Sequence, residues 1–220
     1  MHNLQKKSQK RLGILGGTFD PIHLGHLTLA QLALEQAGLD ALVLMPCHLP
    51  PHREEAHASA EDRLALVRLA VAGKPRITVS EYELEKKSTS YTVETLAHFR
   101  NEMPDAELYF CLGGDSLAQI KSWYQWQKIL ELANLVVLER NQDDSELEQD
   151  IRNRIVEPIE SGRKPAGQIL KLTAPQMNVS ATGIRKRLIA TNCGKEPDSY
   201  LQKWLHPNVL KYIKEHQVYA

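Results

Sequence analysis

Short apolar runs alternate along the chain with longer segments in which apolar residues recur at helical spacing. The runs have the length and composition of buried strands, and the periodic segments are typical of amphipathic helices. The pattern predicts strands over residues 12–15, 41–45, 76–83, 106–112, 135–138 and 169–172. It predicts helices over residues 24–37, 63–72, 92–102, 145–156, 180–189, 200–205 and 207–216. Residues 59–62 resemble a capping box at the start of the second of these helices.

This alternation predicts an α/β fold, a doubly wound, Rossmann-like parallel sheet with helices on both faces, followed by a small C-terminal helical part. In such a sheet, ligands bind beyond the carboxyl ends of the strands, where the strand order reverses. The segments expected at that edge are 16–26, 46–53 and 113–115, together with Arg140. Residues that are far apart in the sequence are therefore predicted to converge on one pocket.

The composition is that of one globular domain. The chain has 220 residues, of which 42% are hydrophobic, and we expect a flexible tail over 1–10 and a single domain over 11–220. The formal net charge is zero and no run approaches the ~20 apolar residues of a membrane span, so neither nucleic acid nor a membrane is an expected partner. The widely spaced cysteines fit reduced thiols and a cytoplasmic location: Cys47, Cys111 and Cys193.

The turn between the first strand and the first helix carries the strongest chemical signal. Its two glycines allow backbone N–H groups to approach a phosphate closely, and its hydroxyl and two imidazoles add side-chain donors. These residues are Gly16, Gly17, Thr18, His23 and His26, with Gly25 leaving room between the histidines. Because a helix N-terminus carries roughly half a positive charge and free N–H groups, the turn predicts an anion site.

Other interpretations of this turn are weaker. Paired glycines after a strand often mark only a tight turn, and a His-x-x-His pair can be half of a metal site. However, no partner stands at a standard zinc spacing, and the chain has no His-Glu-x-x-His segment, so we expect no protein-held metal. The turn also contains neither a Walker lysine motif nor Gly-x-Gly-x-x-Gly, which argues against P-loop enzymes and ordinary dinucleotide-binding dehydrogenases.

A second phosphate signal lies near the C-terminus, over residues 178–185. Ser180 or Thr182 can cap a helix, and Arg185 offers a guanidinium that can bind two phosphate oxygens at once. Taken alone, this segment is more simply a capped helix with a surface arginine. Its combination with the histidine turn predicts two helix ends that grip one triphosphate.

Residues 16–26 resemble the His-x-Gly-His signature of the nucleotidyltransferase superfamily, in particular that of bacterial nicotinate-mononucleotide adenylyltransferases. Ser180, Thr182 and Arg185 match the superfamily's Ile-Ser-x-Thr-x-x-Arg motif. Further segments resemble the nicotinate-mononucleotide branch: Pro50-Pro51-His52-Arg53, Ser90-Tyr91-Thr92, Gly114-Asp115-Ser116 and Trp123-Tyr124. The resemblance extends from about residue 11 to the C-terminus.

The resemblance implies transfer of the adenylyl group of ATP to nicotinate mononucleotide, which gives nicotinate adenine dinucleotide and pyrophosphate in NAD biosynthesis. It implies that His23, His26 and Arg185 are catalytic, with Mg²⁺ held mainly by the ATP phosphates. The residues implied for ATP binding are Gly16, Gly17, Thr18, Phe19, His23, Gly25, His26, Arg140, Ser180, Thr182 and Arg185. Those implied for the second substrate are His52, Arg53, Tyr91, Thr92, Gly114, Asp115, Trp123 and Tyr124.

The residue types suit this chemistry. A nicotinate ring can stack on Trp123. Backbone N–H groups at Tyr91, Thr92 or Tyr124 would donate to its carboxylate and would bind a carboxamide less well. Asp115 resembles the ribose-contacting aspartate of the family and would accept hydrogen bonds from ribose hydroxyls, although a structural role in a turn is an alternative. The attacking phosphate monoester is already ionised near pH 7, since its second pKa is about 6, so no general base is needed.

Several alternatives stay open at the level of sequence. Trp123 is also compatible with a core aromatic. His48 stands with Cys47 where relatives often have asparagines; it could contact a substrate phosphate, but we expect it to face solvent. The acceptor could be another phosphate-bearing substrate such as phosphopantetheine. The chain could also be a non-catalytic nucleotide sensor, although the intact histidines and Arg185 argue against that function. The oligomeric state is not predicted.

Overall fold

The structure is a computed structural model that describes residues 10–48, 56–86, 88–139, 147–157, 164–193 and 197–220. Apart from Lys10, the predicted tail over 1–10 lies outside the described residues. None of the helices in the described ranges is long and apolar enough to cross a membrane.

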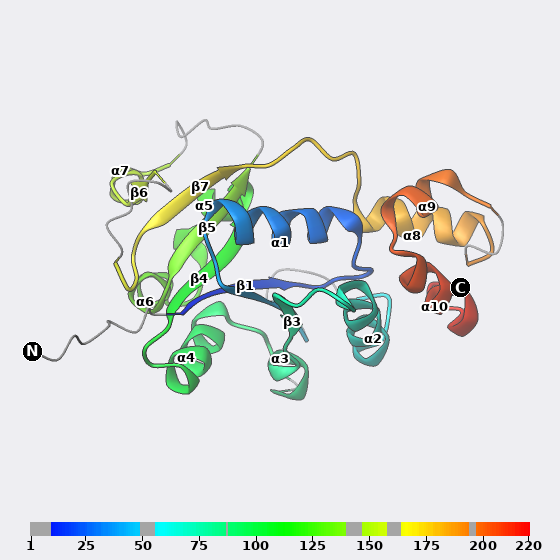
Figure 1. The fold of residues 1–220 in the computed structure, drawn as a ribbon, viewed down its shortest axis with the longest axis horizontal. Helices are drawn as coiled ribbons and strands as arrows, with labels where there is room; N and C mark the ends of the chain where they lie inside the picture. The colour runs from blue at the N-terminus through cyan, green and yellow to red at the C-terminus, as the bar shows by residue number, and fades with distance from the viewer. Residues whose placement is uncertain (1–9, 49–55, 87, 140–146, 158–163, 194–196) are drawn as a thin grey trace, which may run out of the picture.

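The centre of the molecule is a sheet of seven parallel strands in the order β3-β2-β1-β4-β5-β7-β6 (Figure 1). The strands are β1 (Arg11–Gly17), β2 (Ala41–Pro46), β3 (Ile77–Val79), β4 (Glu107–Gly113), β5 (Asn134–Glu139), β6 (Ile155–Val156) and β7 (Ile169–Thr173). From β1 the chain first builds outward through β2 and β3, and then crosses to β4 on the other side of β1. The strand order therefore reverses between β1 and β4.

Helices cover both faces of the sheet, and Figure 1 shows α1 and α4 on opposite sides of it. The helices are α1 (Leu24–Gln36), α2 (Ala60–Val71), α3 (Tyr82–Lys86), α4 (Thr92–Glu102), α5 (Gly114–Ala118), the 3-10 helix η1 (Ile120–Ser122), α6 (Trp126–Leu132), α7 (Gln149–Arg152), α8 (Ala181–Ala190), α9 (Ser199–Trp204) and α10 (Pro207–His216). This confirms the predicted doubly wound α/β fold.

The strands supply a separate hydrophobic core to each face, because neighbouring side chains of a strand point in opposite directions. In β4, Tyr109 and Cys111 join the core beneath α1, α2 and the C-terminal helices. Leu108 and Phe110 join the core formed with α4 and α6. Both faces are thus buried, which explains the continuous apolar runs in the sequence.

Two predicted elements are wrong in part. The strand predicted over 76–83 ends at Val79, and Tyr82–Lys86 forms α3 instead. The Ser80 hydroxyl accepts a hydrogen bond from the backbone N–H of Tyr82 (3.3 Å), which favours a turn over continued strand pairing. The helix predicted over 145–156 is limited in the described part to α7, because Ile155–Val156 pairs with β7 as the edge strand β6.

Other boundaries agree closely with prediction. Helix α4 has the predicted bounds, and α2 begins three residues early, where the Ser59 hydroxyl accepts from the N–H of Asp62 (3.0 Å). The sequence pattern did not predict the short helices α5, η1 and α6. The predicted C-terminal helical part is present as α8, α9 and α10, gathered at one end of the sheet (Figure 1).

Candidate active site

The predicted phosphate turn lies at the carboxyl end of β1, beside the point where the strand order reverses. Gly17 pairs with Pro46 at the end of β2, so the loop that follows β2 starts next to the turn. Phe19 adopts a left-handed backbone conformation (φ 48°), and its side chain is buried in the core. The Asp20–Pro21 peptide bond is cis. The buried Phe19 side chain therefore anchors the turn in the hydrophobic core.

The two imidazoles lie together at the start of α1. Their rings are stacked, with centroids 3.7 Å apart and 20° between the planes. The backbone N–H of His23 donates to Nδ1 of His26 (3.2 Å), so a neutral His26 ring carries its proton on Nε2. A Cβ on Gly25 would lie 2.9 Å from both His23 Nδ1 and a methyl carbon of Val179, which explains the glycine between the histidines.

His23 is neutral at pH 7. Only 8% of its surface is exposed, and this burial lowers its pKa from 6.5 to about 4. The positive character of the turn therefore comes from the helix end and the guanidinium nearby. A neutral imidazole at a helix N-terminus can still donate an N–H to an anion.

The second predicted motif meets the phosphate turn. Nη1 of Arg185 on α8 donates to the backbone oxygen of Asp20 (2.6 Å) and lies 3.6 Å from its carboxylate. Nη2 donates to the Thr182 hydroxyl (3.3 Å), and the Ser180 hydroxyl caps α8 by accepting from the N–H of Gly183 (3.1 Å). Two motifs that lie about 165 residues apart in the chain thus form one site.

The buried Asp20 carboxylate anchors this junction. It accepts from the backbone N–H groups of His57 (2.8 Å) and Ala58 (3.1 Å), in addition to its contact with Arg185. Burial raises the pKa of Asp20, but the backbone hydrogen bonds, the nearby Tyr219 hydroxyl and the Arg185 charge outweigh this effect, so the pKa is below its ordinary value. The sequence indicated only a turn residue here.

Sequence reasoning missed Arg63, which is 2% exposed on α2. Its Nη1 donates to the backbone oxygens of Thr18 and Cys47, both at 2.8 Å, and so joins the phosphate turn to the loop after β2. A signal existed, because Arg63 shares the buried face of α2 with Leu66, Val67 and Ala70. An arginine at a position of apolar spacing marks a buried charge that must find partners.

The described residues among those predicted for the second substrate lie at the start of α4, directly after β4 and after η1. Tyr91 and Thr92 begin α4, and the Tyr91 ring lies 4.9 Å from that of Tyr124. Trp123 is half-buried, and its ring lies edge-to-face against Phe110 of β4, with the centroids 6.1 Å apart. It therefore packs in part against the core, as the alternative interpretation of Trp123 expects. Gly114 and the exposed Asp115 begin α5, directly after β4.

Some predicted residues cannot be placed. His52, Arg53 and Arg140 lie outside the described residues. His48 can be placed: it is half-buried and its Nδ1 is closed off from water, so it faces solvent only in part. All three cysteines are buried and free of disulfides.

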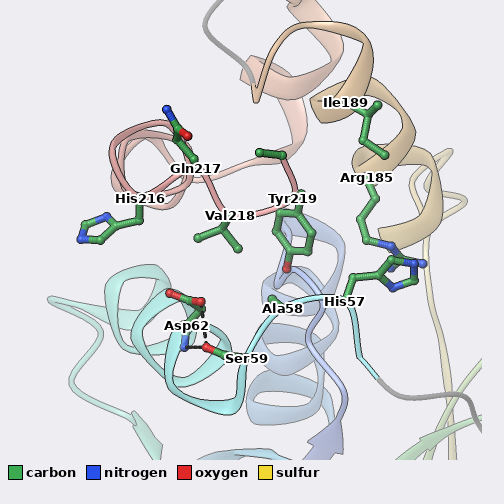
Figure 2. A pocket seen from close by; sticks show the side chains of 11 residues that line it. His57, Ala58, Ser59, Asp62, Arg185, Ile189, His216, Gln217, Val218 and Tyr219 are labelled. Carbon is green, nitrogen blue, oxygen red and sulfur yellow. Dashed lines mark hydrogen bonds between the residues drawn. The ribbon is translucent and has the colours of Figure 1, made fainter.

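A cavity of about 410 Å³ lies behind Arg185, between the start of α2, α8 and the C-terminal residues (Figure 2). Figure 2 shows His57, Tyr219 and the Arg185 side chain side by side at its wall. The cavity contains none of the predicted second-substrate residues that the structure describes. We therefore assign the reaction to the carboxyl ends of the strands. The cavity adjoins that site through Arg185.

Among the residues that the structure describes, the arrangement offers donors for a polyanion but no nucleophile poised beside a base. Two helix N-termini, two imidazoles and one guanidinium can bind and stabilise a polyphosphate. No group of three or more His, Cys, Asp or Glu residues in the described ranges could hold a metal ion. Phosphate chemistry by positioning and charge is what these residues can perform.

Comparison with known proteins agrees with this chemistry. The cytidylyltransferase-like family model matches residues 14–187. A "probable nicotinate-nucleotide adenylyltransferase" of Chromobacterium violaceum is 40% identical over 216 residues, covering 95% of this chain and 98% of that protein. A protein of the same description from Pseudomonas aeruginosa strain UCBPP-PA14 is 39% identical, covering 96% and 97%.

Solved structures show the same fold. The nicotinic acid mononucleotide adenylyltransferase of Plasmodium falciparum, complexed with NaAD, aligns with a TM-score of 0.70 at 21% identity. The alignment covers 96% of this chain and 98% of that one. A second structure of the same enzyme, complexed with APC, gives a TM-score of 0.68.

Proposed function

The chain belongs to the cytidylyltransferase-like family, in its nicotinate-nucleotide adenylyltransferase branch, and on this premise we propose how its residues carry out the reaction. The enzyme transfers the adenylyl group of ATP to nicotinate mononucleotide, giving nicotinate adenine dinucleotide and pyrophosphate, a step of NAD biosynthesis. A cytoplasmic location, with neither nucleic acid nor a membrane as partner, is part of the proposal.

One contact supports the proposed site most strongly. The hydrogen bond from Arg185 to the backbone oxygen of Asp20 brings the start of α8 against the phosphate turn. Both ends of a triphosphate would then be held by helix N-termini. The α-phosphate would lie at His23 and His26, and the β- and γ-phosphates at Arg185 and the start of α8.

The reaction in this site is a direct displacement. An oxygen of the nicotinate mononucleotide phosphate attacks the α-phosphorus of ATP, the bond to the bridging oxygen of the β-phosphate breaks, and pyrophosphate leaves with those electrons. No proton has to be removed from the attacking oxygen, because the phosphate is already ionised near pH 7. The neutral His23 adds a donor without a charge of its own.

Positioning and charge stabilisation account for catalysis by these residues. Two polyanions repel each other, and negative charge grows on the leaving pyrophosphate. The donors at the turn and the Arg185 guanidinium are fixed by hydrogen bonds to the protein before substrate arrives. Such prearranged donors need no reorganisation as charge develops, which is where electrostatic catalysis gains most.

The nicotinate would bind between the start of α4 and the segment after η1. Its ring would stack on Trp123, its carboxylate would meet N–H groups at Tyr91, Thr92 or Tyr124, and Asp115 would hold ribose hydroxyls. A carboxamide would turn its own N–H groups toward those donors, so the acid is the better substrate.

Mg²⁺ fits this site as a companion of ATP. It prefers oxygen ligands, whereas the histidines offer nitrogen and the Asp20 carboxylate is occupied by hydrogen bonds. The ATP phosphates and water would hold the ion, which would neutralise charge on the β- and γ-phosphates. Arg185 would face the same phosphates from the protein side.

The test is a substrate comparison. Pyrophosphate release is measured with ATP and Mg²⁺ against nicotinate mononucleotide, its amide and phosphopantetheine. We expect the acid to give the highest kcat/KM. A preference for phosphopantetheine would contradict the proposed acceptor, and tight ATP binding without pyrophosphate from any acceptor would indicate a nucleotide sensor instead.

A further inference from the structure

A buried carboxylate lies next to the proposed nicotinate site but outside the residues assigned to it. Glu83 of α3 is 6% exposed, and its Oε1 accepts a hydrogen bond from the hydroxyl of Thr95 on α4 (2.6 Å), which is itself 1% exposed. The hydroxyl of Ser90 lies beside Glu83 and acts on its pKa as well. Burial raises the pKa of Glu83, while these two hydroxyls and the Lys86 charge act in the opposite direction.

The bonds around Ser90 have a fixed direction. Its Oγ accepts from the backbone N–H of His48 (3.2 Å), so its single proton is free to be donated to Glu83. Glu83 must accept from two hydroxyls at once, which an ionised carboxylate does with both oxygens. The result is a chain of polar contacts from His48 through Ser90 to Glu83.

This chain joins the parts of the site that bind different substrates. Ser90 directly precedes Tyr91 and Thr92, whose N–H groups are proposed to receive the nicotinate carboxylate. His48 follows Cys47, whose backbone oxygen shares the Arg63 guanidinium with Thr18 of the phosphate turn. The Arg63 hydrogen bonds, the peptide bond between Cys47 and His48, and the bond from His48 to Ser90 therefore connect the phosphate turn to the start of α4.

We propose that Glu83 is a positioning residue for the nicotinate substrate: through its hydrogen bond with Thr95 on α4, and with Ser90 beside it, Glu83 holds the start of α4 at a set distance from the loop after β2. This inference rests on the proposed function. The ATP side does not depend on Glu83, because Arg63 holds Thr18 and Cys47 directly. Loss of the Glu83 contact should therefore weaken the binding of nicotinate mononucleotide and leave the binding of ATP unchanged.

The first experiment separates the two KM values in Glu83→Gln. An amide has one accepting oxygen, so either Thr95 or Ser90 loses its acceptor and faces an N–H group instead. We expect KM for nicotinate mononucleotide to rise about tenfold and KM for ATP to change less than twofold, with a smaller preference for the acid over the amide. Equal increases in both KM values, or a fall in kcat alone, would overturn the proposal.

Glu81→Gln is the matched control. It makes the same chemical change two residues away, at a side chain that is 39% exposed and paired with Arg68 on the surface. Both KM values should stay at their wild-type level in this variant. If Glu81→Gln raised KM for nicotinate mononucleotide as much as Glu83→Gln, the effect would belong to the segment and not to the buried carboxylate.

Ser90 offers variants with a smaller effect on folding. Ser90→Ala removes the middle of the chain and should raise the same KM, whereas Ser90→Thr keeps the hydroxyl and should restore it. Both residues act through one path. The double variant Glu83→Gln with Ser90→Ala should therefore raise KM for nicotinate mononucleotide no more than the single variant with the larger effect. Additive losses would overturn the shared path.

Hydrogen exchange tests the link without any substrate. The backbone N–H of His48 should exchange at least tenfold faster in Glu83→Gln than in wild type or Glu81→Gln, because its acceptor is no longer fixed. Unchanged exchange would overturn the proposal. If the wild-type enzyme made no product from nicotinate mononucleotide, the proposed function would fail, and the exchange rates would still decide the link.

Discussion

In the phosphate turn the key side chains are almost closed off from solvent, whereas Tyr124 on the nicotinate side is 53% exposed. Asp20 is 5% and His23 8% exposed. The Asp20 carboxylate accepts from the backbone N–H of His57, and the His26 ring accepts from the backbone N–H of His23. The nicotinate side consists of aromatic side chains next to α4 and η1, of which Tyr91 and Trp123 are half-buried. The phosphate side is thus arranged in advance for charge, and the nicotinate side selects the substrate by contact area and a few N–H groups.

This difference predicts where mutations act. Changes on the phosphate side should lower kcat, because its donors face the group whose charge changes during the reaction. Changes on the nicotinate side should mainly raise KM for one substrate. The following tests range from the largest expected effect to the smallest.

Removal of an imidazole should have the largest effect. His23→Ala or His26→Ala should lower kcat by about 10²- to 10³-fold, as loss of a donor at a developing charge does elsewhere. Circular dichroism and thermal unfolding should show a folded protein. His98→Ala, on α4 where the ring stacks on Tyr82, is the control and should keep kcat. An unchanged kcat in both turn variants would remove the assigned role.

The buried His23 should make stability depend on pH. Its pKa is about 4 in the folded protein and 6.5 ordinarily, so between these values the unfolded chain binds a proton that the folded chain does not. The free energy of unfolding should therefore fall by up to about 3 kcal/mol as the pH drops from 6.5 to 4.

Denaturant unfolding at several pH values checks this, with His23→Gln as the reference. The variant lacks the titrating ring, so the difference between the two proteins isolates its share. Parallel stability curves for wild type and variant across this window would contradict the burial of a neutral His23.

Arg63 should matter for stability as well as for the site. Arg63→Met removes the donor of two backbone oxygens, and the free energy of unfolding should fall by about 2 kcal/mol. Arg68→Met on the same helix, where the arginine is exposed and paired with Glu81, should cost less than about 1 kcal/mol. Equal losses would mean that the link between the two loops contributes nothing.

The nicotinate side should give the smallest effect. Trp123→Leu should raise KM for nicotinate mononucleotide about 3- to 10-fold, which corresponds to the loss of about 1 kcal/mol of stacking. KM for ATP should not change. Trp204→Leu on α9, in the C-terminal helical part, serves as the control. A fall in kcat with an unchanged KM would contradict the assignment of Trp123 to nicotinate binding.

The sequence predicted the parts of the fold that have strong local signals. Helix α4 combines a clear period with a polar start, and its bounds were correct. The helices α5, η1 and α6 have 5, 3 and 7 residues, which is too short for a helical period to stand out. Ser80 ended a predicted strand early through one side-chain hydrogen bond, a competition that alternation alone does not reveal.

The same holds for the site. His23, His26 and Arg185 could be found because their types and spacing carry a chemical meaning, and the structure brings the turn and Arg185 together. The roles of Asp20, Arg63 and Glu83 depend on partners elsewhere in the chain, such as Cys47 for Arg63. Local sequence contains little information on such pairs.

The central claim is that two helix ends hold ATP so that the adenylyl group passes directly from pyrophosphate to nicotinate mononucleotide. The stereochemical course at the α-phosphorus tests this most directly, with ATP that carries a chiral thiophosphate at that position. A single in-line displacement predicts that the product has inverted configuration. Retention would show two displacements and a covalent adenylyl-enzyme, and would contradict the account.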